Sequence, residues 1–115
     1  MKYKLIIAGG RDFNDYELLQ NSILPLLPSI SEIVSGTCRG ADLLGERFAH
    51  EHNIPIKQFP ANWNLYGKSA GPKRNAQMAE YADACIVFWD GKSKGTKHMI
   101  DIATNRGLPL RIIEY

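Results

Sequence analysis

The segment KLIIAGGRDF, residues 4–13, joins a short apolar run to a turn that contains two adjacent glycines. An apolar run without alternating polar positions is typical of a strand that is buried on both faces, as in a parallel sheet. Gly9 and Gly10 allow the backbone to turn tightly and to approach a ligand without an intervening side chain. Arg11 and Asp12 follow directly, and an arginine can bind a phosphate or a carboxylate with two parallel hydrogen bonds.

The same alternation continues to the other end of the chain. Short apolar runs occupy residues 4–8, 32–35, 55–59, 84–89 and 110–114. Segments with helical spacing separate them, with apolar stripes within residues 16–27, 43–49, 76–81 and 99–103. Alternating strands and helices imply right-handed crossovers. The sequence therefore predicts an α/β fold: a Rossmann-like doubly wound sheet of about five mainly parallel strands, with helices on both faces. At this length, residues 1–115 form a single domain.

The composition is that of an ordinary globular protein, with 44% hydrophobic and 23% charged residues. A net charge of +2 is too small for a general nucleic-acid binder or a membrane-surface protein. Any anion site must therefore arise from a local arrangement of residues. No apolar run is long enough to span a bilayer, and the first is too short for a signal peptide. We expect a cytoplasmic protein without a membrane partner.

The two cysteines, Cys38 and Cys85, form neither a disulfide framework nor a metal-binding set. Cys85 lies in an apolar run and is interpreted as a small buried side chain. Cys38 lies in a glycine-rich turn, where a reactive thiol is an open alternative. His50 and His52 lack the spacing and the partner ligands of a zinc site. The sequence predicts no metal and defines no certain cofactor.

Glycines, cations and hydroxyl-bearing residues gather in the segments that follow the first four strands. In an open α/β sheet these segments meet at one edge, outside the carboxyl ends of the strands, where ligands bind. The candidate ligand-binding residues are Gly9, Gly10, Arg11 and Asp12; Gly36, Thr37, Arg39, Gly40 and Asp42; Pro72, Lys73, Arg74 and Asn75; and Asp90, Gly91, Ser93, Gly95 and Thr96. Four such turns on one edge favour an anionic or nucleotide-type ligand over a purely structural role.

The cations at the predicted helix starts strengthen this interpretation. Free N–H groups and the helix dipole favour an anion there. Lys73 and Arg74 occupy a first turn, where acidic residues are normally preferred, and a bound anion would offset their repulsion. Arg39 precedes the second helix. Asp42 has two interpretations, a helix cap or an acceptor for a ribose hydroxyl, and the cap is the expected one.

One stretch, residues 61–70 (ANWNLYGKSA), fits neither the strand nor the helix pattern. Loops of this kind often carry function in a compact domain. Trp63 and Tyr66 would then close over a base by stacking. The alternative is a surface loop that is pinned by a buried Trp63 and a buried Tyr66.

Taken together, GGRDF, SGTCRGADLLGERFA, FPANWNLYGKSAGPKRNAQM and FWDGKSKGTKHMI resemble the SLOG superfamily, most closely its YspA-like, YpsA-related branch. The resemblance spans nearly the whole chain. It implies a Rossmann-like fold, a ligand related to nucleotides, NAD or ADP-ribose, and a homodimer. The positions that match the ligand-contacting set of the superfamily are Gly9, Gly10, Gly36, Gly40, Arg74, Asn75, Gly91, Gly95 and Thr96.

One departure from the superfamily bears on catalysis. The LOG phosphoribohydrolases, which release a base from a nucleoside monophosphate, carry a glutamate in the pattern PGGxGTxxE. Here residues 90–99 read DGKSKGTKHM, with Met99 at that position. Cleavage of an N-glycosidic bond needs a carboxylate. We therefore expect binding or sensing of a nucleotide-derived small molecule rather than catalysis.

Two alternatives belong to other functional classes. The first is a nucleoside monophosphate N-glycosidase with a relocated carboxylate from Asp12, Asp42, Asp90 or Asp101. The second is a single-stranded DNA-binding module, which only the kinship with the Smf/DprA proteins suggests. The near-neutral charge and the lack of a continuous basic stripe count against nucleic acid as a partner.

Overall fold

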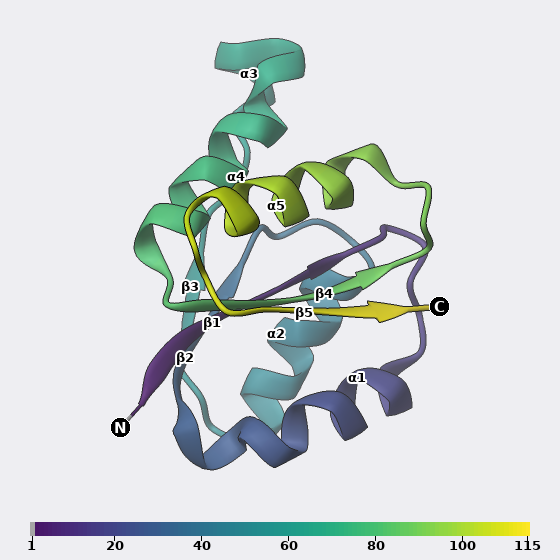
Figure 1. Cartoon of the computed structure of the whole chain (residues 1–115), viewed down its shortest axis with the longest axis vertical. Coiled ribbons are helices and arrows are strands. Elements are labelled where there is room, and N and C mark those ends of the chain that lie inside the picture. Colours follow the sequence, from purple (N-terminus) through teal and green to yellow (C-terminus); the bar gives the residue numbers. More distant parts are fainter. Residues whose placement is uncertain (1) are drawn as a thin grey trace.

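The computed structural model describes residues 2–115, which form a five-stranded parallel sheet in the order β3-β2-β1-β4-β5 (Figure 1). The strands are β1 (Tyr3–Gly9), β2 (Ile30–Ser35), β3 (Ile56–Gln58), β4 (Ala84–Trp89) and β5 (Leu110–Glu114). Every neighbouring pair is parallel. The predicted Rossmann-like α/β fold is confirmed, and each predicted apolar run overlaps a strand.

Two helices cover each face of the sheet (Figure 1). Helices α1 (Tyr16–Ile23) and α2 (Ala41–Glu51) pack on one face, and α4 (Ala70–Tyr81) and α5 (Lys94–Asn105) pack on the other. Side chains alternate across a strand, so Leu5 and Ile7 of β1 join the first core and Ile6 and Ala8 join the second. This two-sided burial explains why the strand is apolar at successive positions.

The spacing of the first apolar stripe, residues 16–27, predicts one continuous helix. The structure instead divides this segment into two helices. Helix α1 ends at Ile23, and a 3-10 helix, η1 (Leu24–Ser29), continues to β2. Pro25 and Pro28 lie in this segment. A proline lacks the backbone N–H that an α-helix needs, and its ring clashes with the preceding turn. The chain therefore tightens into 3-10 geometry before the next strand.

Residues 61–70, predicted as an irregular loop, are largely helical. They contain α3 (Trp63–Tyr66) and η2 (Gly67–Ser69), and α4 already begins at Ala70. Asn62 caps α3, because its side-chain oxygen accepts a hydrogen bond from the Leu65 N–H at 3.0 Å. Trp63 and Tyr66 are 48% and 44% exposed, so the interpretation in which they are buried is wrong. Helix α3 projects from the body of the domain (Figure 1).

The strand order reverses between β1 and β4. The chain runs outward from β1 through β2 to β3, then returns across the sheet to β4 and β5. Such a reversal leaves a crevice outside the carboxyl ends of the two central strands. The four predicted turns begin at this edge. Within residues 2–115, no helix is both long and apolar enough to cross a membrane.

Candidate functional site

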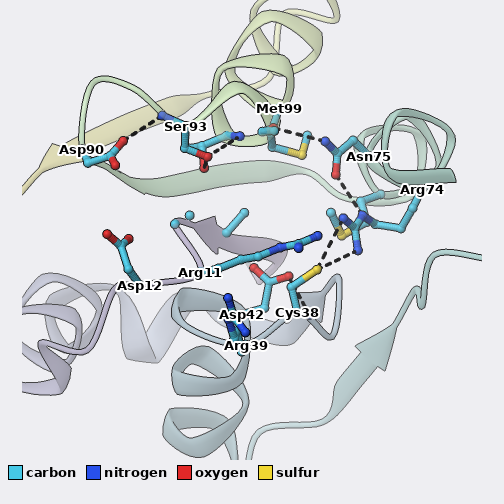
Figure 2. Close-up of a pocket in the computed structure, with 16 residues that line it drawn as sticks. Arg11, Asp12, Cys38, Arg39, Asp42, Arg74, Asn75, Asp90, Ser93 and Met99 are labelled. Carbon is cyan, nitrogen blue, oxygen red and sulfur yellow. Dashed lines mark hydrogen bonds between the residues drawn. The ribbon is translucent and has the colours of Figure 1, made fainter. Parts of the chain in front are cut away.

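A cavity of about 420 Å³ opens at the reversal point, outside the ends of β1 and β4 (Figure 2). Most of the candidate residues line it: Gly9, Gly10, Arg11, Asp12, Arg39, Asp42, Arg74, Asn75, Asp90, Ser93, Gly95 and Thr96. Ala8, Cys38, Met78 and Met99 complete the lining. The predicted strand-to-helix turns therefore meet in one hollow.

The remaining candidates lie elsewhere. Gly36 and Thr37 line an adjoining cavity, and Gly91 lines a third one beside Trp89. Pro72 and Lys73 are exposed and line none of these three cavities. The Lys73 Nζ instead lies 4.9 Å from the centre of the Tyr66 ring.

Gly40 holds two of the turns together instead of lining the cavity. Its φ of +84° lies in the left-handed region, and a Cβ there would be 2.2 Å from the Gly10 carbonyl oxygen. That oxygen accepts hydrogen bonds from the N–H groups of Phe13 and Ala41, both at 3.2 Å. Only a glycine at position 40 allows the first and second turns to approach this closely.

Arg74 links α4 to the turn after β2. It is only 8% exposed, and its Nη1 donates a hydrogen bond to the Gly36 carbonyl oxygen at 2.5 Å. Its Nε donates to Asn75 Oδ1 at 2.9 Å, and Nη1 and Nη2 lie 3.7 and 3.8 Å from Cys38 Sγ. The predicted anion-binding cation is therefore also a structural link between two elements.

Asn75 extends this link to α5. The side chain is 6% exposed, and its Nδ2 lies 3.4 Å from the Gly95 carbonyl oxygen and 3.2 Å from His98 Nδ1. Because its Oδ1 accepts from Arg74, the amide has partners on both sides. Asn75 thus connects the third and fourth turns at the wall of the cavity.

Asp42 is a buried carboxyl group in the cavity and not the helix cap that the sequence predicts. Gly40 is the N-cap of α2, and Asp42 Oδ2 accepts a hydrogen bond from the Cys38 N–H at 3.2 Å. Burial raises the pKa of Asp42 from 3.8 to about 6. The Cys38 N–H and the nearby Arg74 guanidinium lower the pKa and offset only part of this effect.

The turn after β4 holds the carboxylate of Asp90. Its Oδ1 accepts hydrogen bonds from the N–H groups of Lys92 and Ser93, both at 2.8 Å, and these bonds lower the pKa of Asp90. Ser93 caps α5 through its side-chain oxygen, which faces the Thr96 N–H at 3.4 Å. Asp101 lies outside the cavity and forms an exposed ion pair with Lys97.

Sequence reasoning missed Tyr115, whose hydroxyl donates a hydrogen bond to Asp12 Oδ1 at 2.7 Å. Its ring packs against Phe13, which in turn stacks on Phe88. No local signal joins residues 12 and 115, since their proximity arises from the sheet. Ala8 and Met78, which form an apolar wall together with Met99, were also missed, although helical spacing marks Met78 as a core position.

Arg11 and Arg39 are the free cations of the site. Both are exposed and line the cavity, and neither forms an ion pair within residues 2–115. Arg11 is close enough to Asp42 to lower the pKa of its carboxyl group. The same part of the chain contains no group of three His, Cys, Asp or Glu side chains placed to hold a metal ion. Two exposed guanidinium groups in one cavity suit an anion.

Comparisons with known proteins agree with this architecture. A sequence profile of YAcAr, the YspA, cpYpsA-related SLOG family, matches residues 3–66. The Gene 61 protein of Mycobacterium phage D29 is 31% identical, over 93% of this chain and 93% of its own. The X-ray structure of DNA processing protein A (DprA) from Streptococcus pneumoniae matches 97% of this chain with a TM-score of 0.77 and 16% identity. This chain spans half the length of the DprA chain, and the likeness is one of fold.

Proposed function

Because this chain belongs to the YspA, cpYpsA-related SLOG family, we propose that it binds a nucleotide-derived small molecule in the cavity between β1 and β4. One observation carries the proposal. Two guanidinium groups, Arg11 and Arg39, line a hollow at the reversal point of a doubly wound sheet, and neither has an ion-pair partner among residues 2–115. Such points are where open α/β sheets bind ligands, and guanidinium groups match phosphate in shape and charge.

The lining supplies a partner for each part of a nucleotide. The phosphate groups would contact Arg11 and Arg39, close to the glycine backbone after β1. Asp12 and Asp90 offer carboxylate oxygens for ribose hydroxyl groups. The ring would lie against the apolar wall that contains Met99.

A titration of the purified protein with AMP, ADP and ADP-ribose tests the proposal. We expect saturable binding by calorimetry, weakened about tenfold or more in Arg11→Ala and in Arg39→Ala, since a hydrogen bond to a charged group contributes about 1.5–3 kcal/mol. Lys73→Ala is the matched control, because this exposed cation lies at the same edge but outside the cavity. A folded protein that binds none of these nucleotides would exclude the function.

One observation favours the N-glycosidase as a second candidate. Asp42 is a buried carboxyl group in the cavity, with its pKa raised to about 6, as a general acid or base near neutral pH requires. Incubation with nucleoside monophosphates, followed by chromatography, tests for released base. Base release by the wild type that is lost in Asp42→Asn would support the N-glycosidase. If the wild type releases no base even at high protein concentration, the N-glycosidase is excluded and ligand binding stays the proposed function.

A homodimer, which the family resemblance implies, and a cytoplasmic location, which the sequence suggests, stay predictions within this proposal. Sedimentation of the purified protein tests the first. A mass near the 12.9 kDa of one chain would contradict it.

A further inference from the structure

A second cavity, of about 440 Å³, adjoins the first and shares part of its wall. It is lined by Arg11, Gly36, Thr37, Cys38, Arg39, Pro60, Ala61, Trp63 and Arg74. Arg11, Cys38, Arg39 and Arg74 line both cavities. The two hollows therefore meet at a seam that three guanidinium groups line.

An aromatic side chain forms the far side of the second cavity. Trp63 begins α3, which the Asn62 cap fixes, and the residue is 48% exposed. A Cβ on Gly71 would lie 3.3 Å from the indole Cη2, so the ring edge packs against the start of α4. A large aromatic ring that is half exposed beside a cationic seam is suited to stacking on a planar group.

The three arginines at the seam differ in the hydrogen-bond and ion-pair partners that their guanidinium groups have within the protein. The Arg74 guanidinium donates to the Gly36 carbonyl and to Asn75. Arg11 and Arg39 are exposed, with no ion-pair partner within residues 2–115. One guanidinium group commonly binds one phosphate through its planar fork. Two free guanidinium groups at one seam match two linked phosphates better than a single one.

We infer that the two cavities form one bipartite site for a ligand whose two halves are joined by a diphosphate, with a ring of the second half stacked on Trp63. This inference rests on the proposed function and specifies its ligand class. The first half lies in the cavity between β1 and β4, the diphosphate lies at the seam by Arg11 and Arg39, and the second half extends towards α3. A mononucleotide would leave the indole ring without a partner.

Three ligands of increasing size test the inference. AMP carries one half, ADP-ribose adds the second phosphate and a ribose, and diadenosine diphosphate adds a second base. We expect ADP-ribose to bind about tenfold or more tightly than AMP, through the added phosphate. Diadenosine diphosphate should gain about fivefold more, as expected for one stacked aromatic pair.

Single substitutions test which residue is responsible for each gain in affinity. Trp63→Ala should remove the gain of diadenosine diphosphate over ADP-ribose and leave the affinities for AMP and ADP-ribose unchanged. Trp63→Phe retains an aromatic ring and should keep most of the gain. Arg39→Ala should reduce the gain of ADP-ribose over AMP. Because Trp63 is half exposed, its replacement does not open the core. The stacking ligand should also quench Trp63 fluorescence, an effect that is absent in Trp63→Phe.

The outcomes separate the inference from the proposed function. If AMP binds but the two longer ligands bind no more tightly, the bipartite site is wrong and the nucleotide site stands. If Trp63→Ala weakens AMP as much as diadenosine diphosphate, the ring at α3 belongs to the first half and the inference is overturned. If none of the three ligands binds to the folded protein, both proposals fail.

Discussion

The carboxyl group of Asp42 lies beneath the turn after β2, where it is only 5% exposed. Burial disfavours its charged form, and the Cys38 N–H and the Arg74 guanidinium compensate in part. The folded protein therefore holds a proton on this group at a pH where an unfolded chain has released it. This difference links the cavity to the stability of the whole domain.

Between pH 3.8 and about 6 the folded state binds more protons at Asp42 than the unfolded state, so its contribution to stability falls as the pH rises. The difference corresponds to about 3 kcal/mol in the free energy of unfolding. Asp42→Asn should abolish this component. Urea unfolding at pH 4, 5, 6 and 7 measures it, with the exposed Asp101→Asn as control. Identical pH profiles for the wild type and Asp42→Asn would contradict the assignment.

For single residues, the sequence predicts which side chains lie in the site better than it predicts their hydrogen-bond partners. Arg11 and Asp12 follow β1 after Gly10, and parallel strands place such residues at one edge, so their presence in the site follows from sequence order. The hydrogen bond of Asp12 with Tyr115 spans 103 residues and has no local signature. The cap predicted at Asp42 fails for a similar reason, since the left-handed backbone of Gly40 sets where α2 begins.

Among the elements, α4 begins one residue before the predicted helix start, and its two adjacent cations have different surroundings. Gly71 and Pro72 suggest a helix start, but α3 and η2 lead the chain directly into a helix from Ala70. A proline is tolerated in this first turn because its missing N–H would have no partner within the helix. Lys73 of this helix lies beside Tyr66 and not in the cavity, while Arg74 is buried against the second turn.

Two helical glycines should respond in opposite ways to the same substitution. A Cβ on Gly45 of α2 would lie 2.9 Å from Ile7 Cγ2, whereas a Cβ on Gly95 of α5 would meet nothing within 4 Å. Replacing a helical glycine by alanine stabilises by up to about 1 kcal/mol in open space. Overpacking against a stiff β-branched side chain costs about 1–3 kcal/mol. We expect Gly95→Ala to raise the unfolding free energy and Gly45→Ala to lower it.

Chemical unfolding of the wild type and of both variants at one pH measures these changes in the free energy of unfolding. A Gly45→Ala protein as stable as Gly95→Ala would show that α2 can move away from β1. The contrast also tests the packing that holds the second turn in place.

In the molecule as a whole, the alternation of apolar runs and helical stripes was enough to predict the fold class. Parallel strands buried on both faces have a distinctive composition, and they place all carboxyl ends at one edge. The seam between the two cavities was not predictable. It depends on where α3 places Trp63, and residues 61–70 show neither strand nor helix periodicity.

The charge of the whole chain predicts how binding depends on salt. With a net charge of +2, the cations act locally at the seam and not along an extended stripe. We expect AMP affinity to fall by no more than about tenfold between 50 and 200 mM salt. A protein that makes many phosphate contacts with nucleic acid loses about 10³–10⁵ over this range. Fluorescence anisotropy with a single-stranded oligonucleotide provides the comparison, and oligonucleotide binding that is tighter than AMP binding at 200 mM salt would favour the DNA-binding alternative.

The contact between Tyr115 and Asp12 also has a practical consequence for reporter design. Because all strands are parallel, β1 starts at the edge opposite the cavity, whereas β5 ends at the cavity edge (Figure 1). A fluorophore attached after Tyr115 would therefore sit at the rim of the ligand site, and one attached ahead of β1 would sit on the far side. The first would act as a built-in optical sensor of occupancy, and the second would be its silent reference.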